Sequence, residues 1–273
     1  MIRRLFILNF FLHAYLACGQ APFSHHTPQN IYAESRELYD RAMYSTAAEG
    51  FQNVISKVDS ETDLAEQSSF FYVLCGIKLM NRDAGDQVLK FLNEYPTSAR
   101  RKELILGMSE YSFNRRRYRD AKIWLNRLNG MYLPKKEKAE LQFKLGYSLF
   151  MLKDFENARA QFSAAKSSDF NISSSAQYYY GHIAYLDTND VTALENLEPL
   201  IDHPSFGFVV PYYLAQIYSR RLMDDKLLAL GESLFKKSSI KRLPEISKLI
   251  GQSLLRKKRY DEALPYLLMH RDR

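Results

Sequence analysis

The sequence predicts an all-α fold, an array of about seven helical hairpins stacked side by side. Apolar residues recur at helical spacing along almost the whole chain, whereas alternating Val, Ile and Thr runs bounded by tight turns are sparse. The 273 residues include only 11 Gly and 9 Pro, and 46% of them are hydrophobic, which is the composition of a folded protein. The third observation is a pair of small residues that recurs along the chain.

The first nineteen residues predict a secretory signal peptide. A charged start, MIRR, precedes an apolar run from Leu5 to Ala17, and these thirteen residues are too few to span a bilayer, which needs about 20. Small residues at 17–19 allow cleavage before Gln20, which lowers the formal net charge from +7 to +5 because Arg3 and Arg4 are lost. A lipoprotein would instead keep Cys18 as its lipidated first residue. Both alternatives predict export.

Residues 20–30, QAPFSHHTPQN, are polar and interrupted by proline, and predict a tether between the leader and the array. His25 and His26 are adjacent and have no spaced partner, so we expect no metal site there. Cys75 is the only other cysteine, and a single thiol cannot form an internal disulfide. The hairpin array is predicted from residue 31 to residue 273.

Each predicted hairpin carries a marker residue, usually small, on its first helix and a second marker twelve residues later. In order along the chain, the pairs are Ser35 and Ala47, Tyr72 and Ala84, Ser109 and Ala121, Gly146 and Ala158, Gly181 and Ala193, Ala215 and Leu227, and Gly251 and Ala263. The first markers are 34 to 37 residues apart. Glycine inside a helix costs about 1 kcal/mol relative to alanine. We therefore expect Gly146 and Ala158 to face each other where two helices nearly touch.

Two further positions repeat with the markers. An aromatic residue stands three residues before the alanine in four copies: Tyr44, Tyr118, Phe155 and Tyr260. A bulky apolar residue stands four residues after it in six copies: Phe51, Val88, Leu125, Phe162, Leu197 and Leu267. Short polar turns such as LKD, NRRR and RKKR separate the two helices of a copy.

This pattern resembles the tetratricopeptide repeat (TPR), a helical hairpin with small residues at these two positions, an aromatic before the second and often a terminal proline. Pro96 fits that proline. The resemblance covers residues 31–273 and implies a right-handed α-α superhelical solenoid. The leader, with the segments FKLGYSLF and YYYGHIAY, is similar to exported cell-envelope TPR proteins of Gram-negative bacteria. Because no polar capping helix follows Ala263, we expect a truncated array or the start of a longer one.

Catalytic and cofactor patterns are absent from the sequence. It contains no GxGxxG, GxxxxGK[ST], HExxH, paired CxxC or GxSxG. His182 is the histidine that merits weighing, since it follows Gly181 inside a repeat, but no Ser, Cys or carboxylate completes a triad with it. We expect a protein that is not an enzyme and that needs no cofactor or metal.

The resemblance implies that the first helices line a concave groove. The residues that the resemblance places in this groove are Phe113, Phe143, Tyr147, Phe150, Tyr178, His182, Tyr185, Tyr212 and Gln216. So many aromatic rings suit a peptide or an extended segment, because Tyr and Phe bury a large area at little entropic cost. For any single ring, packing against the adjacent repeat is the favoured alternative. Aromatic residues and His182 also replace the Lys and Asn of carboxylate-clamp TPR domains, so such a clamp is not expected.

Basic residues gather in the turns within the repeats, and stacking predicts a basic rim. Its members are Arg115, Arg116, Arg117, Arg220, Arg221, Arg256, Lys257, Lys258 and Arg259. Solvated turns are the favoured interpretation, and contact with acidic lipid headgroups or an acidic partner is the alternative. Export and the modest charge argue against nucleic acid as a partner.

These observations predict a non-catalytic protein-protein interaction scaffold of the bacterial cell envelope, in the periplasm or at the outer membrane, which binds a partner segment in the groove. Two alternatives stay open. One is a periplasmic sensory or regulatory TPR module of a longer signalling protein. The other is a glycan- or peptidoglycan-binding protein in which Tyr178, Tyr185 and Tyr212 stack on sugars.

Overall fold

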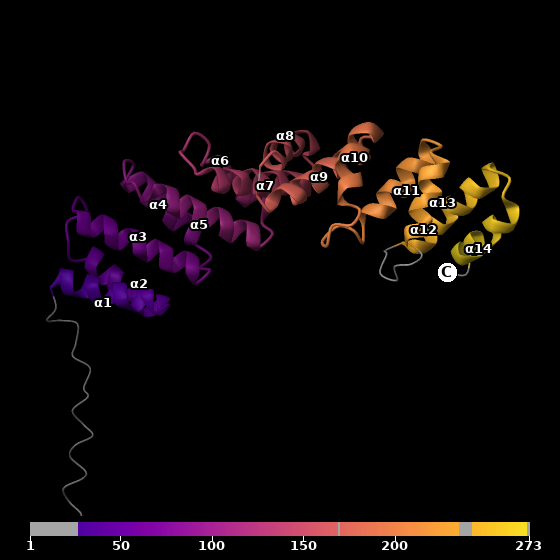
Figure 1. The fold of residues 1–273 in the computed structure, drawn as a ribbon. Coiled ribbons are helices and arrows are strands. Elements are labelled where there is room, and N and C mark those ends of the chain that lie inside the picture. The colour runs from indigo at the N-terminus through magenta and orange to yellow at the C-terminus, as the bar shows by residue number, and fades with distance from the viewer. Residues whose placement is uncertain (1–26, 169, 235–241, 272–273) are drawn as a thin grey trace, which may run out of the picture. The chain divides into compact units, whose positions relative to one another are not determined.

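The computed structural model describes residues 27–168, 170–234 and 242–271, and within these ranges it is all-helical and contains no strand (Figure 1). The predicted signal peptide, Cys18 and most of the predicted tether lie outside the described residues. Residues 28–30 were assigned to the tether, but they form the first turn of helix α1. Pro28 fits the first helical position, and the Thr27 hydroxyl caps the helix by accepting a hydrogen bond from the Asn30 N–H at 3.3 Å.

The chain divides into two compact units, residues 1–108 and 109–273, whose boundary falls within helix α5. The first unit holds α1 (Pro28–Asp40), α2 (Tyr44–Ile55), α3 (Asp63–Lys78), α4 (Ala84–Glu94) and the start of α5 (Arg101–Asn114). The second holds the rest of α5, α6 (Tyr118–Asn126), α7 (Lys135–Met151), α8 (Phe155–Lys166), α9 (Ile172–Leu186), α10 (Asp190–Leu197), the 3-10 turn η2 (Glu198–Leu200), α11 (Val210–Arg220), α12 (Asp224–Leu234), α13 (Leu243–Arg256) and α14 (Tyr260–Arg271).

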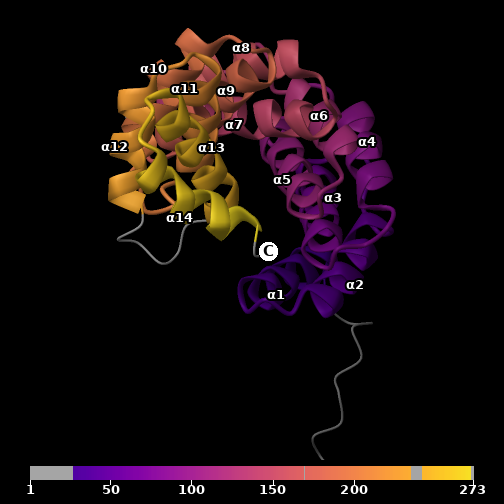
Figure 2. The same cartoon turned by 90° about the vertical axis from the view of Figure 1, so that its right-hand side faces the viewer.

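Consecutive helices pair as the repeat predicts. α1 packs on α2, α3 on α4, α7 on α8, α9 on α10, α11 on α12, and α13 on α14, and the last of these pairs can be followed in two views (Figure 1, Figure 2). Within each unit, the second helix of a hairpin also contacts the first helix of the next one, as α2 does with α3 and α8 with α9. The hairpins therefore bury their apolar faces against their neighbours in the chain.

The second markers are all core residues, exposed by at most 1%: Ala47, Ala84, Ala121, Ala158, Ala193, Leu227 and Ala263. The glycines, however, do not face these markers as directly as expected. A Cβ at Gly146 would lie 3.0 Å from the ring of Phe162 and 3.1 Å from the Gln161 Cβ, one turn beyond Ala158. Gly181 likewise meets Leu197, whereas Gly251 meets Leu267 and, at 3.4 Å, also the carbonyl oxygen of its marker Ala263. The small residue is needed because the bulky side chain sixteen residues later packs onto it.

One marker in the second copy is displaced by a single residue. Tyr72 is only half-buried, whereas the next residue, Val73, is 3% exposed. Val73 is also seven residues before Met80, the left-handed residue of the turn, and this spacing is found in the other copies. The first helix of this hairpin is therefore shifted by one position relative to the predicted marker.

The turn inside each of the seven hairpins is closed by a residue with positive φ, and none of these residues is glycine. They are Ala42, Met80, Arg116, Lys153, Thr188, Leu222 and Lys258, with φ between 56° and 64°. At Lys153 the N–H donates to the Phe150 carbonyl, and the Asp154 N–H donates to the Leu149 carbonyl, both at 2.9 Å. This is the Schellman arrangement, which satisfies the last carbonyls of the first helix and turns the chain back along it.

Candidate interaction site

Aromatic side chains of four first helices form one continuous network in the second unit. Phe113 on α5 contacts Tyr147 on α7, with ring centroids 5.6 Å apart, and Tyr147 contacts Phe143 at 6.1 Å. Phe150 on α7 then contacts His182 on α9 at 5.6 Å. Eight of the nine predicted groove residues belong to this network; the ninth, Gln216, is half-buried beside Ala215 on α11.

Tyr179 on α9 is a hub of this network that the sequence analysis missed. Its ring lies 5.2 Å from both Tyr147 and Phe150, 6.1 Å from Phe143, and 5.3 Å from Phe162, on which it stacks. The first helix α7 thus offers Phe143, Tyr147 and Phe150, and the next hairpin inserts Tyr179 among them. The contact of Tyr179 with the rings of α7 is packing between adjacent repeats, which is the interpretation favoured above for single rings.

Tyr213 on α11 repeats the arrangement one hairpin later. Its ring lies 4.8 Å from His182, 5.0 Å from Tyr185 and 5.6 Å from Tyr212. Like Tyr179, it stands two residues before the first marker of its hairpin. Tyr213 thus brings Tyr185 and Tyr212 together with His182.

The first unit builds the same cluster around Phe71 on α3, which was not predicted either. Phe71 lies 6.3 Å from Tyr32, 5.2 Å from Tyr39 and 5.4 Å from Phe51, on which it stacks. The Arg36 guanidinium sits 3.9 Å from the centre of the Phe71 ring, at the helix position that Tyr147 and His182 occupy in the second unit. The inserted ring is therefore a repeated feature of the fold.

Burial separates the residues that only support the network from those that reach the surface. Tyr178 is 8% exposed and stacks on Phe206 with centroids 4.5 Å apart, so it belongs to the core, and this burial raises the pKa of its hydroxyl. The other rings are half-buried and keep an exposed edge. We call the following set the aromatic surface: Phe113, Phe143, Tyr147, Phe150, Tyr179, His182, Tyr185, Tyr212 and Tyr213.

His182 is an uncharged member of this surface at neutral pH. Burial lowers its pKa below the usual 6.5, because the charged imidazolium would lose its hydration. No hydrogen-bond partner for its buried Nδ1 lies among the described residues. Phe150, Tyr178, Tyr185 and Tyr213 surround the ring.

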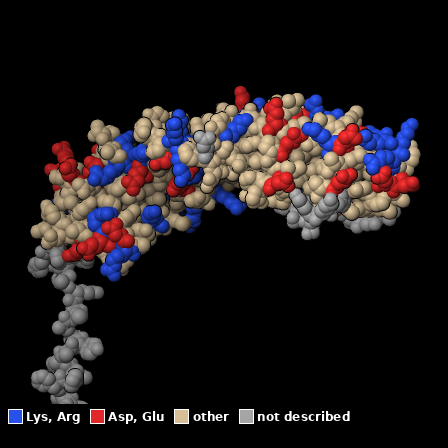
Figure 3. Space-filling view, viewed as in Figure 1, with Lys and Arg blue, Asp and Glu red and all other residues tan. Residues whose placement is uncertain are grey.

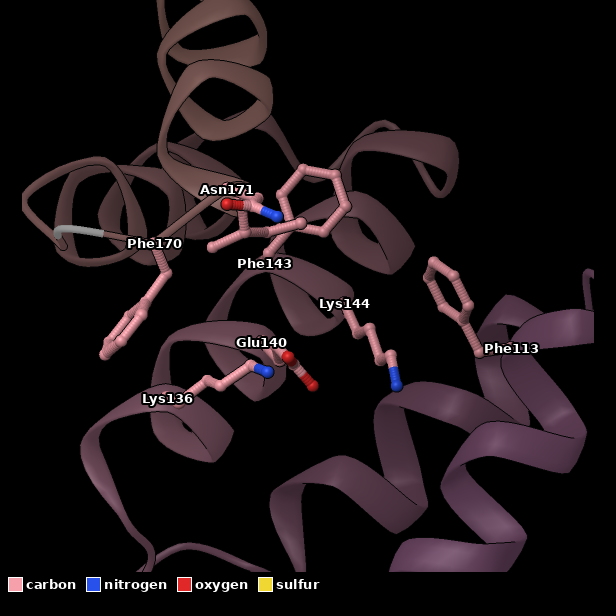
Figure 4. A pocket seen from close by; sticks show the side chains of 8 residues that line it. Phe113, Lys136, Glu140, Phe143, Lys144, Phe170 and Asn171 are labelled. Atoms are coloured by element: carbon pink, nitrogen blue, oxygen red, sulfur yellow. The ribbon is translucent and has the colours of Figure 1, made fainter.

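A pocket of about 450 Å³ adjoins the aromatic surface, and we call it the α7–α9 pocket (Figure 4). It is lined by Phe113, Lys136, Glu140, Phe143, Lys144, Phe170, Asn171 and Ile172. Phe113 and Phe143 were predicted groove residues, and the other six were not. Lys144 forms an ion pair with Glu110 on α5 at 2.8 Å.

Four of the nine residues of the predicted basic rim form ion pairs with acidic neighbours. Arg220 pairs with Asp190, Arg256 with Asp224 at 2.5 Å, Lys257 with Asp225 at 2.7 Å, and Arg259 with Glu262 at 2.5 Å. The hydrogen bonds from Arg256 hold the pKa of Asp224 below its usual value. Arg115 and Arg117 lie near the Tyr111 ring, at 5.7 and 5.9 Å.

Figure 3 shows the same mixture of charges, with Lys and Arg interleaved with Asp and Glu over the visible face. Among the described residues, no cluster of His, Cys, Asp and Glu could hold a metal ion. The helices in the same ranges also include none long and apolar enough to cross a bilayer.

Neither a protein-family model nor a curated protein matches the sequence. Solved structures do match the fold. A tetratricopeptide repeat protein from Parabacteroides merdae is 12% identical, with 90% of this chain and 92% of that chain covered and a TM-score of 0.50. The C-terminal part of a TPR repeat-containing protein from Cytophaga hutchinsonii is 16% identical, with 89% of each chain covered and a TM-score of 0.51. The predicted fold is confirmed: the described residues form an all-α array of helical hairpins with the fold of TPR solenoids.

Proposed function

From its TPR-solenoid fold, we propose that this chain is a non-catalytic scaffold that binds an extended segment of another protein on the aromatic surface. The observation that carries the proposal is the continuous network of half-buried rings over α5, α7, α9 and α11. A surface of this kind suits protein recognition because aromatic rings supply contact area with few rotatable bonds.

The rings of the aromatic surface are held in place before any partner arrives. Tyr179 is fixed between Phe143, Tyr147, Phe150 and Phe162, and Tyr213 is fixed between His182 and Tyr185. A bound segment would therefore lose its own freedom but impose little ordering on the scaffold, which favours affinity.

We place the protein in the cell envelope of a Gram-negative bacterium, in the periplasm or at the outer membrane. The predicted leader supports this location, since its charged start and short apolar run fit a secretory signal. Mass spectrometry of the mature N-terminus tests the location. Cleavage before Gln20 or a lipidated Cys18 would support export, and an intact Met1 on the protein from its native cells would contradict it.

Photo-crosslinking in native cells, followed by recovery of the whole chain, tests the proposed binding. We expect Tyr147→Ala and Tyr185→Ala to lower the recovery of the crosslinked partner by about tenfold, because hot-spot aromatics contribute about 1–2 kcal/mol or more. Tyr132→Ala is the matched control, since Tyr132 is 88% exposed and lies outside the aromatic surface.

Circular dichroism would establish that the variants stay folded. Recovery equal to that of the unchanged protein in both folded variants would contradict binding at the aromatic surface. Retention on purified peptidoglycan, lost in Tyr185→Ala, would favour the glycan-binding alternative instead.

A further inference from the structure

The positive charge of this chain is concentrated in residues 115–138, which hold the turn before α6, α6 itself, the connection to α7 and the start of α7. This stretch contains nine Lys and Arg residues and two acidic residues, so its net charge of +7 equals the formal net charge of the whole chain. The remaining residues contain 29 basic and 29 acidic side chains and are neutral together. We propose that the stretch docks the protein on an anionic lipid surface, with Ile123 and Tyr132 entering the headgroup region.

Neighbouring acidic residues do not cancel this charge. Lys122 pairs with Asp154, which precedes α8, at 3.6 Å. In the adjoining parts of α5 and α7, Glu110 pairs with Lys144 at 2.8 Å, and Glu140 lies between Lys144 and the stretch. When Glu110, Glu140, Lys144 and Asp154 are all counted with the stretch, a net charge of +5 is left.

The structure thereby narrows the predicted basic rim to one of its turns. Arg115, Arg116 and Arg117 belong to the stretch, whereas four rim residues in later turns have acidic partners. The positive surface therefore follows α6 instead of running along the turns of successive hairpins.

The basic side chains of the stretch are exposed, apart from the half-buried Lys122. Arg119, Ile123 and Arg127 recur at four-residue spacing, which places them on one face of α6, and all three are exposed. The nine residues of α6 span only about 14 Å, so basic residues before and after the helix can reach the same lipid surface. We call the following set the α6 basic surface: Arg115, Arg116, Arg117, Arg119, Ile123, Arg127, Tyr132, Lys135, Lys136 and Lys138.

Two large apolar side chains stand among these charges. Ile123 is 55% exposed and Tyr132 is 88% exposed. An aliphatic side chain gains free energy at the boundary between headgroups and acyl chains, and tyrosine favours the same interface. Nucleic acid offers an aliphatic side chain no such apolar layer. The combination of charge and apolar side chains therefore favours a lipid surface as the anionic partner.

Sedimentation of the whole chain with lipid vesicles tests the proposal. One set of vesicles is phosphatidylcholine, and the other contains about one-third phosphatidylglycerol, which supplies the anionic surface. We expect the partition coefficient to be at least about tenfold higher on the anionic vesicles and the difference to shrink as salt is raised from about 0.1 to 1 M. An uncleaved leader or a lipid on Cys18 would bind both kinds of vesicle, so the difference between the two kinds is the readout.

A charge variant locates the contact. The triple variant Arg119→Gln, Arg127→Gln, Lys135→Gln should lower the partition coefficient on anionic vesicles by about 10- to 100-fold, because each cation near such a surface contributes about fivefold. The matched control is Arg41→Gln, Lys78→Gln, Lys248→Gln, which removes the same charge from exposed positions outside the stretch. This control should stay within about twofold of the unchanged chain, because salt screens distant charges.

An apolar variant tests entry into the headgroup region. Ile123→Ser with Tyr132→Ser keeps every charge and should weaken binding to anionic vesicles by about 3- to 10-fold. Circular dichroism would establish that all variants stay folded. Equal binding to both kinds of vesicle, an equal loss in the two triple variants, or unchanged binding of the apolar variant would each overturn the proposal.

An acidic protein is the alternative occupant of the α6 basic surface. If the vesicles were not distinguished and the Arg119, Arg127 and Lys135 variant lost a crosslinked acidic protein, the surface would belong to a protein partner instead, and the lipid proposal would fail. None of the substituted positions belongs to the aromatic surface, so the crosslinking experiment decides the proposed function separately.

Discussion

Replacing Gly146 by alanine tests the reason for a glycine inside α7. The added Cβ would lie 3.0 Å from two ring carbons of Phe162 and 3.1 Å from the Gln161 Cβ, which is closer than ordinary van der Waals contact. Phe162 is fully buried, and its ring stacks on Tyr179 at 5.3 Å. The ring therefore has little room to move away.

The size of the effect follows from two opposing terms. Alanine raises helix propensity by about 1 kcal/mol over glycine, whereas overpacking a core costs about 1–3 kcal/mol. We expect Gly146→Ala to lower the free energy of unfolding by about 0–2 kcal/mol. Gly76→Ala is the control, because a Cβ at Gly76 in α3 would meet only the Asn81 amide nitrogen, at 3.7 Å. This control should gain up to about 1 kcal/mol.

Urea denaturation followed by circular dichroism measures both variants against the unchanged chain. The two substitutions are chemically identical, so the difference between them isolates the contact with Phe162. If Gly146→Ala stabilised the protein as much as Gly76→Ala, the close approach of α7 and α8 could not be the reason for the glycine. A Gly146→Ala, Phe162→Leu double variant should recover part of the loss, because leucine leaves room for the new methyl group.

Three further perturbations follow from the turns and the titrating groups. Lys153→Gly should raise the free energy of unfolding in urea by up to about 1 kcal/mol, since a left-handed L-residue costs about 1–2 kcal/mol and glycine's extra freedom when unfolded offsets part of that; a lower stability would contradict this. The lowered pKa of His182 means that the unfolded chain binds more protons just below pH 6.5, so thermal stability should fall as the pH drops through that value, and less so in His182→Phe. The pKa of Asp224 is lowered by Arg256, so its stabilisation is present above about 3.8 and lost in acid. Asp224→Asn should therefore have a lower free energy of unfolding than the unchanged chain near neutral pH and the same free energy of unfolding at low pH.

The hairpins were predictable because the marker positions are the places where helices cannot separate. Ala158 and Phe162 are fully buried, so the size and polarity of their side chains are constrained. The repeat is therefore visible in the sequence at these positions. The shift at Tyr72 was not predictable, because Ala84 keeps its place on the second helix while the first helix is displaced by one residue. The sequence could not show whether Gly146 packs against Ala158 or against Phe162, because both residues recur at a fixed spacing from the first marker. The coordinates show that Phe162 is the neighbour.

The site was predictable only in part. The resemblance located rings at Phe143, Tyr147 and Phe150, but it gave no position for a ring that enters from the next hairpin. A signal for Tyr179 and Tyr213 was present, since each stands two residues before the first marker of its hairpin. Lys136 and Asn171 lie near or in the connections between hairpins, where sequence and length vary and the repeat carries no information.

The left-handed turns have a consequence for how the array is assembled. Seven side-chain-bearing residues hold a backbone geometry that each of them, taken alone, would leave for a more populated one. A solitary hairpin therefore closes at a local conformational cost that its turn hydrogen bonds offset only in part, and packing against neighbouring helices supplies the rest. The smallest cooperative element of this protein should accordingly be larger than one repeat, so that damage in one turn spreads to its neighbours rather than staying local.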